Sequence, residues 1–84
     1  MDVAAIQERL LGFVTSELLN DRDDLVLGPE DDLLSTELVD SLGVMRIVVF
    51  IEDTFGVKVM PADVTIENFI SISTISVYVA GLRG

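Results

Sequence analysis

The first regular pattern of apolar and polar positions lies between Val3 and Leu19. Large apolar residues recur there at spacings of three and four, which is typical of an amphipathic helix with one face on a core. These residues are Val3, Ile6, Leu10, Phe13, Val14 and Leu18. Asp2 precedes the pattern, and its carboxylate is suited to cap the helix by accepting a free backbone N–H. We predict a first helix with a scaffolding role.

Residues 20–40 contain two clusters of turn-forming residues that interrupt any helical period. We predict a long loop, held on the core by Leu25, Leu27, Leu33 and Leu38. Asp21 and Asp23 would be the first ligands of a calcium loop. The sixth position of that loop is Val26 rather than glycine, and the twelfth is Asp32 rather than glutamate, so no metal site is predicted.

Residues 42–55 are rich in β-branched residues, but their length and boundaries favour a helix over a strand. Ser41 is suited to be the N-cap, and Gly56 tolerates the left-handed conformation that often ends a helix. On this helix one apolar stripe should face the core. Its members are Val44, Ile47, Val48, Ile51 and Phe55.

A second apolar row on the same helix contains Leu42, Met45 and Val49. It is bordered by the charged residues Arg46, Glu52 and Asp53. A small bundle could bury both rows, whereas an exposed apolar strip with charged borders is typical of a docking surface. Because the row comes directly after Ser41, we favour the docking surface.

After an extended connector at residues 57–60, Thr65 is suited to cap one short helical turn. The apolar spacing of Ile72, Ile75, Val79 and Leu82 predicts a last helix, with Ser73 as its cap. The predicted fold is therefore all-α. It is a small four-helix bundle of three longer helices and one short helix, with a long loop between the first two, in a single domain over residues 1–84.

The chain has 84 residues, with 15 acidic and 5 basic side chains and a net charge of −10. Such a charge repels nucleic acid and anionic lipid and attracts proteins that carry lysine and arginine patches, so neither nucleic acid nor a membrane is an expected partner. We expect a monomer. No apolar run approaches a membrane span, and the acidic start lacks the basic flank of a signal peptide. A cytoplasmic protein is expected.

The chain contains no cysteine and no histidine. Ser41 therefore has no imidazole to activate it as a nucleophile, and Ser-Lys chemistry would depend on Lys58, the only lysine. Two roles remain open for Ser41 from the local sequence. It is either a plain helix cap or a modification site, because a helix N-terminus stabilises an attached phosphate.

The motif Asp40-Ser41-Leu42, after a long loop and before Phe55-Gly56, resembles the acyl and peptidyl carrier protein family. The resemblance extends over nearly the whole chain, including Ile66–Phe69 and the Ile75/Val79 helix. It implies a carrier without catalytic activity of its own. Ser41 would carry 4′-phosphopantetheine from coenzyme A, and the thiol of this arm would hold the cargo as a thioester.

The resemblance also implies the partners and the residues that meet them. Asp40 would belong to the motif that a phosphopantetheinyl transferase recognises. A loading ligase or acyltransferase and a downstream synthase would dock on the second helix. The implied docking residues are Leu42, Met45, Arg46, Val49, Glu52 and Asp53.

Two positions depart from the family pattern. Gly43 and Arg46 stand where fatty-acid carriers often have acidic residues. We therefore expect a dedicated carrier of a polyketide, nonribosomal peptide or amino-acid-loading pathway. The competing hypothesis is an unmodified interaction module that docks a protein through Leu42, Met45 and Val49, with Ser41 only a cap.

Overall fold

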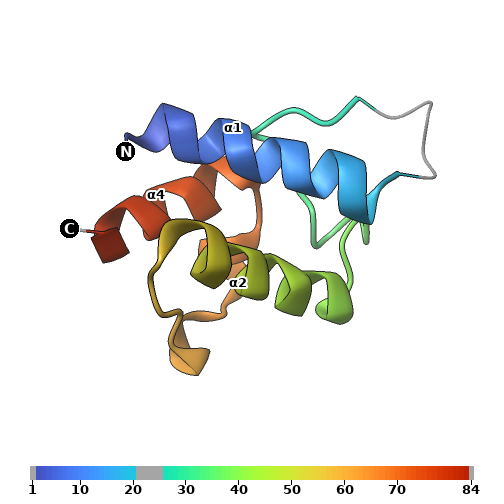
Figure 1. The fold of residues 1–84 in the computed structure, drawn as a ribbon. Coiled ribbons are helices and arrows are strands. Elements are labelled where there is room, and N and C mark those ends of the chain that lie inside the picture. The colour runs from blue at the N-terminus through green and yellow to red at the C-terminus, as the bar shows by residue number, and fades with distance from the viewer. Residues whose placement is uncertain (1, 21–25, 84) are drawn as a thin grey trace.

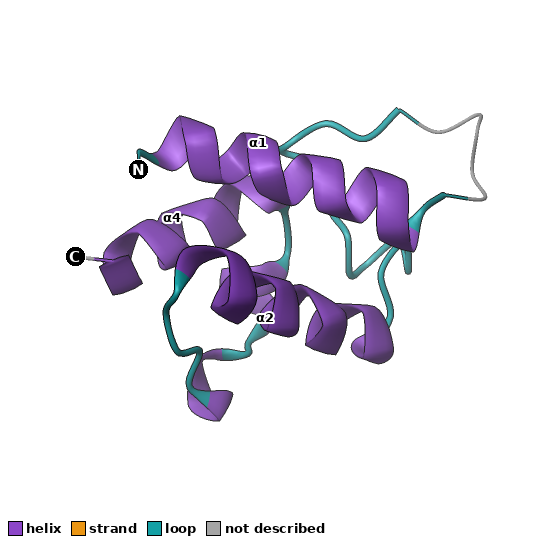
Figure 2. Ribbon diagram, viewed as in Figure 1, coloured by secondary structure: helices purple, strands orange, loops and turns teal. Residues whose placement is uncertain are grey.

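In the part of the chain that the structure describes, four α-helices form the framework of the fold (Figure 1). The computed structural model describes residues 2–20 and 26–83, and this part of the chain contains no strand (Figure 2). The helices are α1 (Val3–Phe13), α2 (Ser41–Phe55), α3 (Ile66–Phe69) and α4 (Ile72–Arg83), with a π-helical turn η1 (Val14–Leu18) and a 3-10 turn η2 (Pro61–Asp63). The all-α prediction of three longer helices and one short helix is confirmed. No helix within the described ranges has both the length and the apolar character needed to cross a membrane.

The first helix begins as predicted, and its predicted apolar face lies on the core except for Val3, which is 38% exposed. The backbone N–H of Ala5 donates to Asp2 Oδ1 at 2.9 Å, so Asp2 is the N-cap of α1. Ile6, Leu10 and Val14 are fully buried. The helix continues through η1 to Leu18, and α1 lies beside α4 in the bundle (Figure 1).

The described part of the long loop is held on the core by side chains and by backbone bonds to the C-terminal region. Leu27 and Leu33 are buried, as predicted, and Leu38 is partly buried. The N–H of Leu33 donates to Ile70 O at 2.7 Å, which fixes the loop before α2. The predicted anchor Leu25 and the calcium candidates Asp21 and Asp23 lie outside the described residues.

The predicted core stripe of α2 is confirmed. Ile47, Val48, Ile51 and Phe55 are buried, and Val44 packs against them while partly exposed. Gly56 ends the helix with φ 67°, a left-handed conformation that costs glycine little.

The C-terminal helices show one confirmed cap and one correction. Thr65 Oγ1 accepts from the N–H of Asn68 at 3.3 Å, which caps α3 as predicted. The prediction that Ser73 caps the last helix is wrong, because α4 already begins at Ile72 and Ser73 lies within its first turn. Ser71 Oγ accepts from Thr74 N–H at 3.2 Å and Thr74 Oγ1 accepts from Ser71 N–H at 3.1 Å. This reciprocal pair satisfies the first turn of α4.

Tyr78 joins α4 to the segment that precedes α3. Its hydroxyl donates to Asp63 Oδ2 at 2.8 Å. Asn68 Nδ2 donates to the backbone oxygen of the same Asp63 at 2.9 Å. Asp63 thus links η2 to both later helices and fixes the position of α3.

Tyr78 is the only tyrosine, so its titration can be followed directly by phenolate absorbance. Burial, together with its hydrogen bond to the Asp63 carboxylate, raises the pKa of Tyr78 from 10.0 to about 12. The folded protein therefore holds this proton more tightly than the unfolded chain. Its contribution to stability is fully present below the unfolded pKa and is lost as pH rises through the folded pKa.

We expect an absorbance midpoint near 12 in the folded protein and near 10.0 after denaturation. Tyr78→Phe should lower the free energy of unfolding at neutral pH by about 1 kcal/mol, the value of one hydrogen bond, and weaken the alkaline loss of stability. An unshifted midpoint in the folded protein would contradict this account of the Tyr78–Asp63 pair.

Candidate functional site

Asp40 and Ser41 form the start of α2, but not with the roles that the sequence predicted. The N–H of Gly43 donates to Asp40 Oδ1 at 2.8 Å, so Asp40 is the N-cap and the prediction that Ser41 caps the helix is wrong. Asp40 is the N-cap because its backbone is extended, whereas Ser41 already lies within the helix. Ser41 is exposed, and among the described residues its hydroxyl has no hydrogen-bond partner.

Asp40 gives a test that separates capping from charge. Asp40→Ala should lower the free energy of unfolding by roughly 0.5–2 kcal/mol, because Gly43 N–H loses its acceptor, whereas Asp40→Asn should keep most of the cap. Chemical denaturation of the three proteins measures this difference. Equal stability of the alanine variant and the unaltered protein would show that the carboxylate does not hold the helix start.

A groove opens beside Ser41, between the first turns of α2 and the segment around α3. Its volume is about 770 Å³. Apolar side chains form most of its wall, namely Leu34, Val39, Val44, Met45, Val64, Ile66 and Phe69. Glu37, Asp40, Ser41 and Thr65 supply its polar groups. We call this cavity the Ser41 groove.

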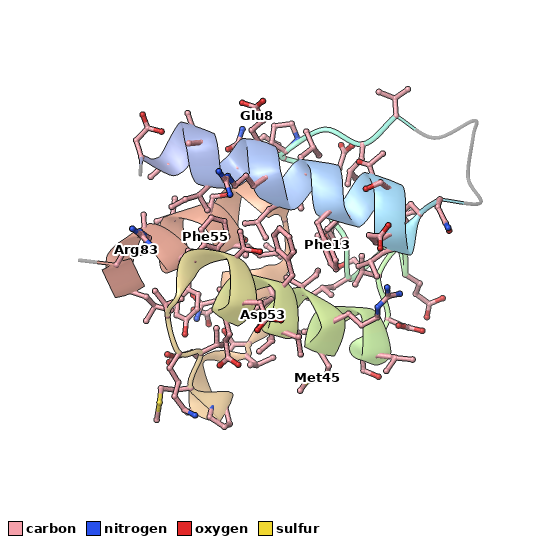
Figure 3. All side chains as sticks on the ribbon, in the orientation of Figure 1. Glu8, Phe13, Met45, Asp53, Phe55 and Arg83 are labelled. Atoms are coloured by element: carbon pink, nitrogen blue, oxygen red, sulfur yellow. The ribbon has the colours of Figure 1, made fainter. Side chains whose placement is uncertain are left out.

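The second apolar row of α2 lies on the surface. Leu42, Met45 and Val49 are 70%, 54% and 55% exposed, so the interpretation in which the bundle buries both rows is wrong. Figure 3 shows Met45 and Asp53 along α2. Arg46 and Asp53 are exposed beside the row.

Glu52 differs from the other charged residues of the predicted docking set. Its Oε2 accepts from the N–H of Val59 at 2.9 Å, and the side chain is only partly exposed. This carboxylate holds the connector after α2. Because Glu52 has this structural role, Asp53 is the exposed acidic residue at the end of the row.

Close packing requires a glycine at position 43, which the sequence analysis did not predict. It is buried, and a Cβ there would lie 2.8 Å from Val39 Cγ1 and 3.4 Å from Asp40 Oδ1. An acidic side chain at this position would displace Val39 from the core or disturb the cap. The glycine therefore allows the loop to cross close to the first turn of α2.

Sequence reasoning also missed part of the Ser41 groove. Val64, Ile66 and Phe69 form its far wall, although the sequence placed the short helix only as a fold element. Glu37, which also lines the groove, has φ 59°, which is uncommon for a residue other than glycine. The predicted cap at Thr65 indicated that a short helix begins there. No local sequence pattern indicated that this helix, α3, would face Ser41.

The fold and the site together define a small helical bundle that presents an exposed serine at the N-terminus of its second helix, next to an apolar groove. The family model described as "Phosphopantetheine attachment site" matches residues 4–79. The chain therefore belongs to this family, the phosphopantetheine attachment domain of acyl and peptidyl carrier proteins. No curated protein matches the chain.

Membership of this family defines the cofactor and the general role. Its domains attach 4′-phosphopantetheine covalently and serve as carriers, generally without catalytic activity. A phosphopantetheinyl transferase modifies them, and synthase enzymes interact with them. The residues at the α2 N-terminus fit such a group, because Ser41 offers a free hydroxyl and the groove beside it offers room for an arm.

Proposed function

We propose that Ser41 is the attachment residue of the phosphopantetheine arm and that residues 1–84 act as one carrier domain. The observation that supports this most is the exposed hydroxyl of Ser41. This hydroxyl does not cap the helix, because Asp40 does so. A transferase can therefore remove the proton of the Ser41 hydroxyl, whose oxygen attacks the phosphate that bears pantetheine in coenzyme A. The new O–P bond replaces the pyrophosphate bond, adenosine 3′,5′-bisphosphate leaves, and the helix start stays intact.

The surroundings of Ser41 suit the phosphate end of the arm. The positive end of the α2 macrodipole stabilises an attached anion by about 0.3–1 kcal/mol at an exposed site. Because the N–H of Gly43 donates to Asp40, the amides of Ser41 and Leu42 would be the helix-start donors available to the phosphate. When attached, the arm supplies a thiol that holds cargo as a thioester, and the Ser41 groove offers an apolar surface along which it can lie.

The proposed docking surface for the enzymes that make, load and use the arm contains Leu42, Met45 and Val49, with Arg46 and Asp53 at its edge. These enzymes are a phosphopantetheinyl transferase, a loading ligase or acyltransferase, and a downstream synthase or transferase. The exposed row supports this proposal because its burial would remove large apolar side chains from water. We propose that the carrier works as a cytoplasmic monomer.

The proposed pathway is a dedicated polyketide, nonribosomal peptide or amino-acid-loading one. Arg46 gives the docking surface a cation, and Gly43 excludes an acidic group, so the surface suits partners other than those that bring a purely basic patch.

Mass spectrometry of the protein isolated from its native host tests the pathway. We expect an aminoacyl or polyketide-type group bound through a thioester that hydroxylamine releases. The same treatment of protein carrying only the arm is the control. A series of saturated fatty acyl chains would contradict the proposed pathway while leaving the carrier role intact.

A further inference from the structure

Met45 lies where the Ser41 groove meets the proposed docking surface. It follows Ser41 by one helical turn, so the two side chains lie on the same side of α2. Met45 lines the Ser41 groove and also a second groove of about 490 Å³, which runs past Leu42 and Val49. It is the one described residue that lines both grooves. A chemical change at Met45 therefore alters both surfaces at once.

The sulfur of Met45 is open to oxidation. The chain contains no cysteine and no tryptophan, so its methionine sulfurs are the side-chain atoms that a peroxide oxidises most readily. Met45 is 54% exposed, so a small oxidant can reach the side chain. A readily oxidised group thus lies one turn from Ser41.

Hydrogen peroxide supplies the oxygen atom for this reaction. A lone pair of the Met45 sulfur attacks one peroxide oxygen, and an S–O bond forms while the O–O bond breaks. The proton on the attacked oxygen moves to the leaving oxygen, which departs as water. The sulfur loses two electrons and the peroxide gains them. Methionine sulfoxide reductases reverse the oxidation, because two thiols reduce the sulfoxide to the sulfide and yield a disulfide and water.

The sulfoxide is poorly suited to both surfaces that Met45 lines. Oxidation converts a flexible apolar side chain into a polar one. Its oxygen accepts hydrogen bonds from water, and apolar neighbours cannot replace these bonds when a partner excludes the water. The neighbours are apolar on the docking surface, where Leu42 and Val49 lie, and in the Ser41 groove, where Val44 and Ile66 lie. A sulfoxide at Met45 therefore weakens docking and the packing of an arm in the groove.

We propose that Met45 is a reversible oxidation site through which hydrogen peroxide slows the carrier. This proposal rests on the proposed function, because it concerns the docking of the enzymes that act at Ser41. The sulfoxide lowers the rate at which these enzymes modify and use the protein, and its reduction restores that rate. The Ser41 hydroxyl itself is unchanged by the oxidation.

Met60 is a matched control for Met45. It is 53% exposed, so peroxide reaches both methionines to a similar extent. Met60 lies at the end of the connector before η2 and lines neither groove. The two methionines therefore differ in their surroundings and not in their chemistry. Met1 lies outside the described residues and is kept in every protein that is compared.

The test compares the unaltered protein with Met45→Leu and Met60→Leu. Each is treated with hydrogen peroxide, catalase removes the excess, and peptide mass spectrometry confirms a sulfoxide at the remaining methionines. The kcat/KM of phosphopantetheine transfer from coenzyme A by a permissive phosphopantetheinyl transferase is measured before and after oxidation. Each protein is compared only with itself, so any effect of leucine on the starting rate cancels.

We expect oxidation to lower kcat/KM by about tenfold in the unaltered protein and in Met60→Leu, because both retain Met45. Met45→Leu should keep its own starting value. Treatment of the oxidised proteins with methionine sulfoxide reductases of both stereospecificities should restore the lost rate.

Four results would overturn the proposal. These are an unchanged rate in the oxidised unaltered protein, an equal loss in Met45→Leu, a loss that the reductases do not reverse, or a loss of helical circular dichroism on oxidation. The last would mean that the fold, and not the docking surface, is affected. No mass gain in the unoxidised protein would contradict the proposed function, and the oxidation site with it. A mass gain that oxidation does not slow would overturn the oxidation site alone.

Discussion

Ser41→Ala is expected to abolish the addition of phosphopantetheine by a permissive phosphopantetheinyl transferase. The unaltered protein should gain the mass of one phosphopantetheine when incubated with coenzyme A, and the alanine variant should gain none. The reason is chemical, because the Ser41 hydroxyl is the oxygen that would form the phosphoester. Asp40 caps α2 through Gly43 N–H, so removing the hydroxyl leaves the helix start in place.

Ser35→Ala is the matched control for this experiment. Ser35 is an exposed serine of the loop before α2, so its loss should leave the mass gain unchanged. Circular dichroism of both variants shows whether they are folded. A mass gain that survives in folded Ser41→Ala would place the attachment on another residue.

Phe69→Ala is expected to have the largest effect on stability. Phe69 is 1% exposed, the centroid of its ring lies 6.0 Å from that of Tyr78, and it lines the Ser41 groove. Replacing a buried phenylalanine by alanine costs about 3–5 kcal/mol. The free energy of unfolding of a domain of this size is roughly 4–13 kcal/mol, so the substitution would remove much of the stability.

Thermal and chemical denaturation measure this loss, and Val77→Ala is the control. Val77 is 60% exposed on α4, the helix that packs against α3, so its truncation should change stability little. A Phe69→Ala variant as stable as Val77→Ala would mean that α3 is not part of the folded core.

The helices that interact mainly through periodic apolar faces were predictable from sequence. α1 and the buried stripe of α2 follow spacings of three and four, which depend only on helix geometry. The caps at Asp2 and Thr65 and the left-handed Gly56 were also predictable, because each acts within a few residues of its own position. Such features need no knowledge of distant contacts.

The errors came where two nearby residues compete for one local role. Asp40 and Ser41 are both good N-caps, and Ser71 and Ser73 are too, so composition alone does not choose between them. At α4 a contact with a distant loop helps to fix the helix start, since the Ser73 N–H donates to Pro29 O at 2.8 Å. Such long-range contacts are invisible to a local pattern.

The position of the candidate attachment serine was predictable from the sequence, but its surroundings in the fold were not. The motif at residues 40–42 located Ser41, while the Ser41 groove needed the first turns of α2 to meet α3, a contact that no local pattern predicts. The exposure of Met45 and Val49 decided between two interpretations that the sequence left open. The structural roles of Gly43 and Glu52 depend on close packing against Val39 and on a hydrogen bond from Val59. No periodic pattern in the sequence predicts these contacts.

Fragment mass spectrometry of the protein isolated from its native host tests the central claim most directly. We expect phosphopantetheine on the peptide that contains Ser41, attached to that residue and to no other serine. Protein that is wholly unmodified, or phosphopantetheine attached at a different residue, would contradict it.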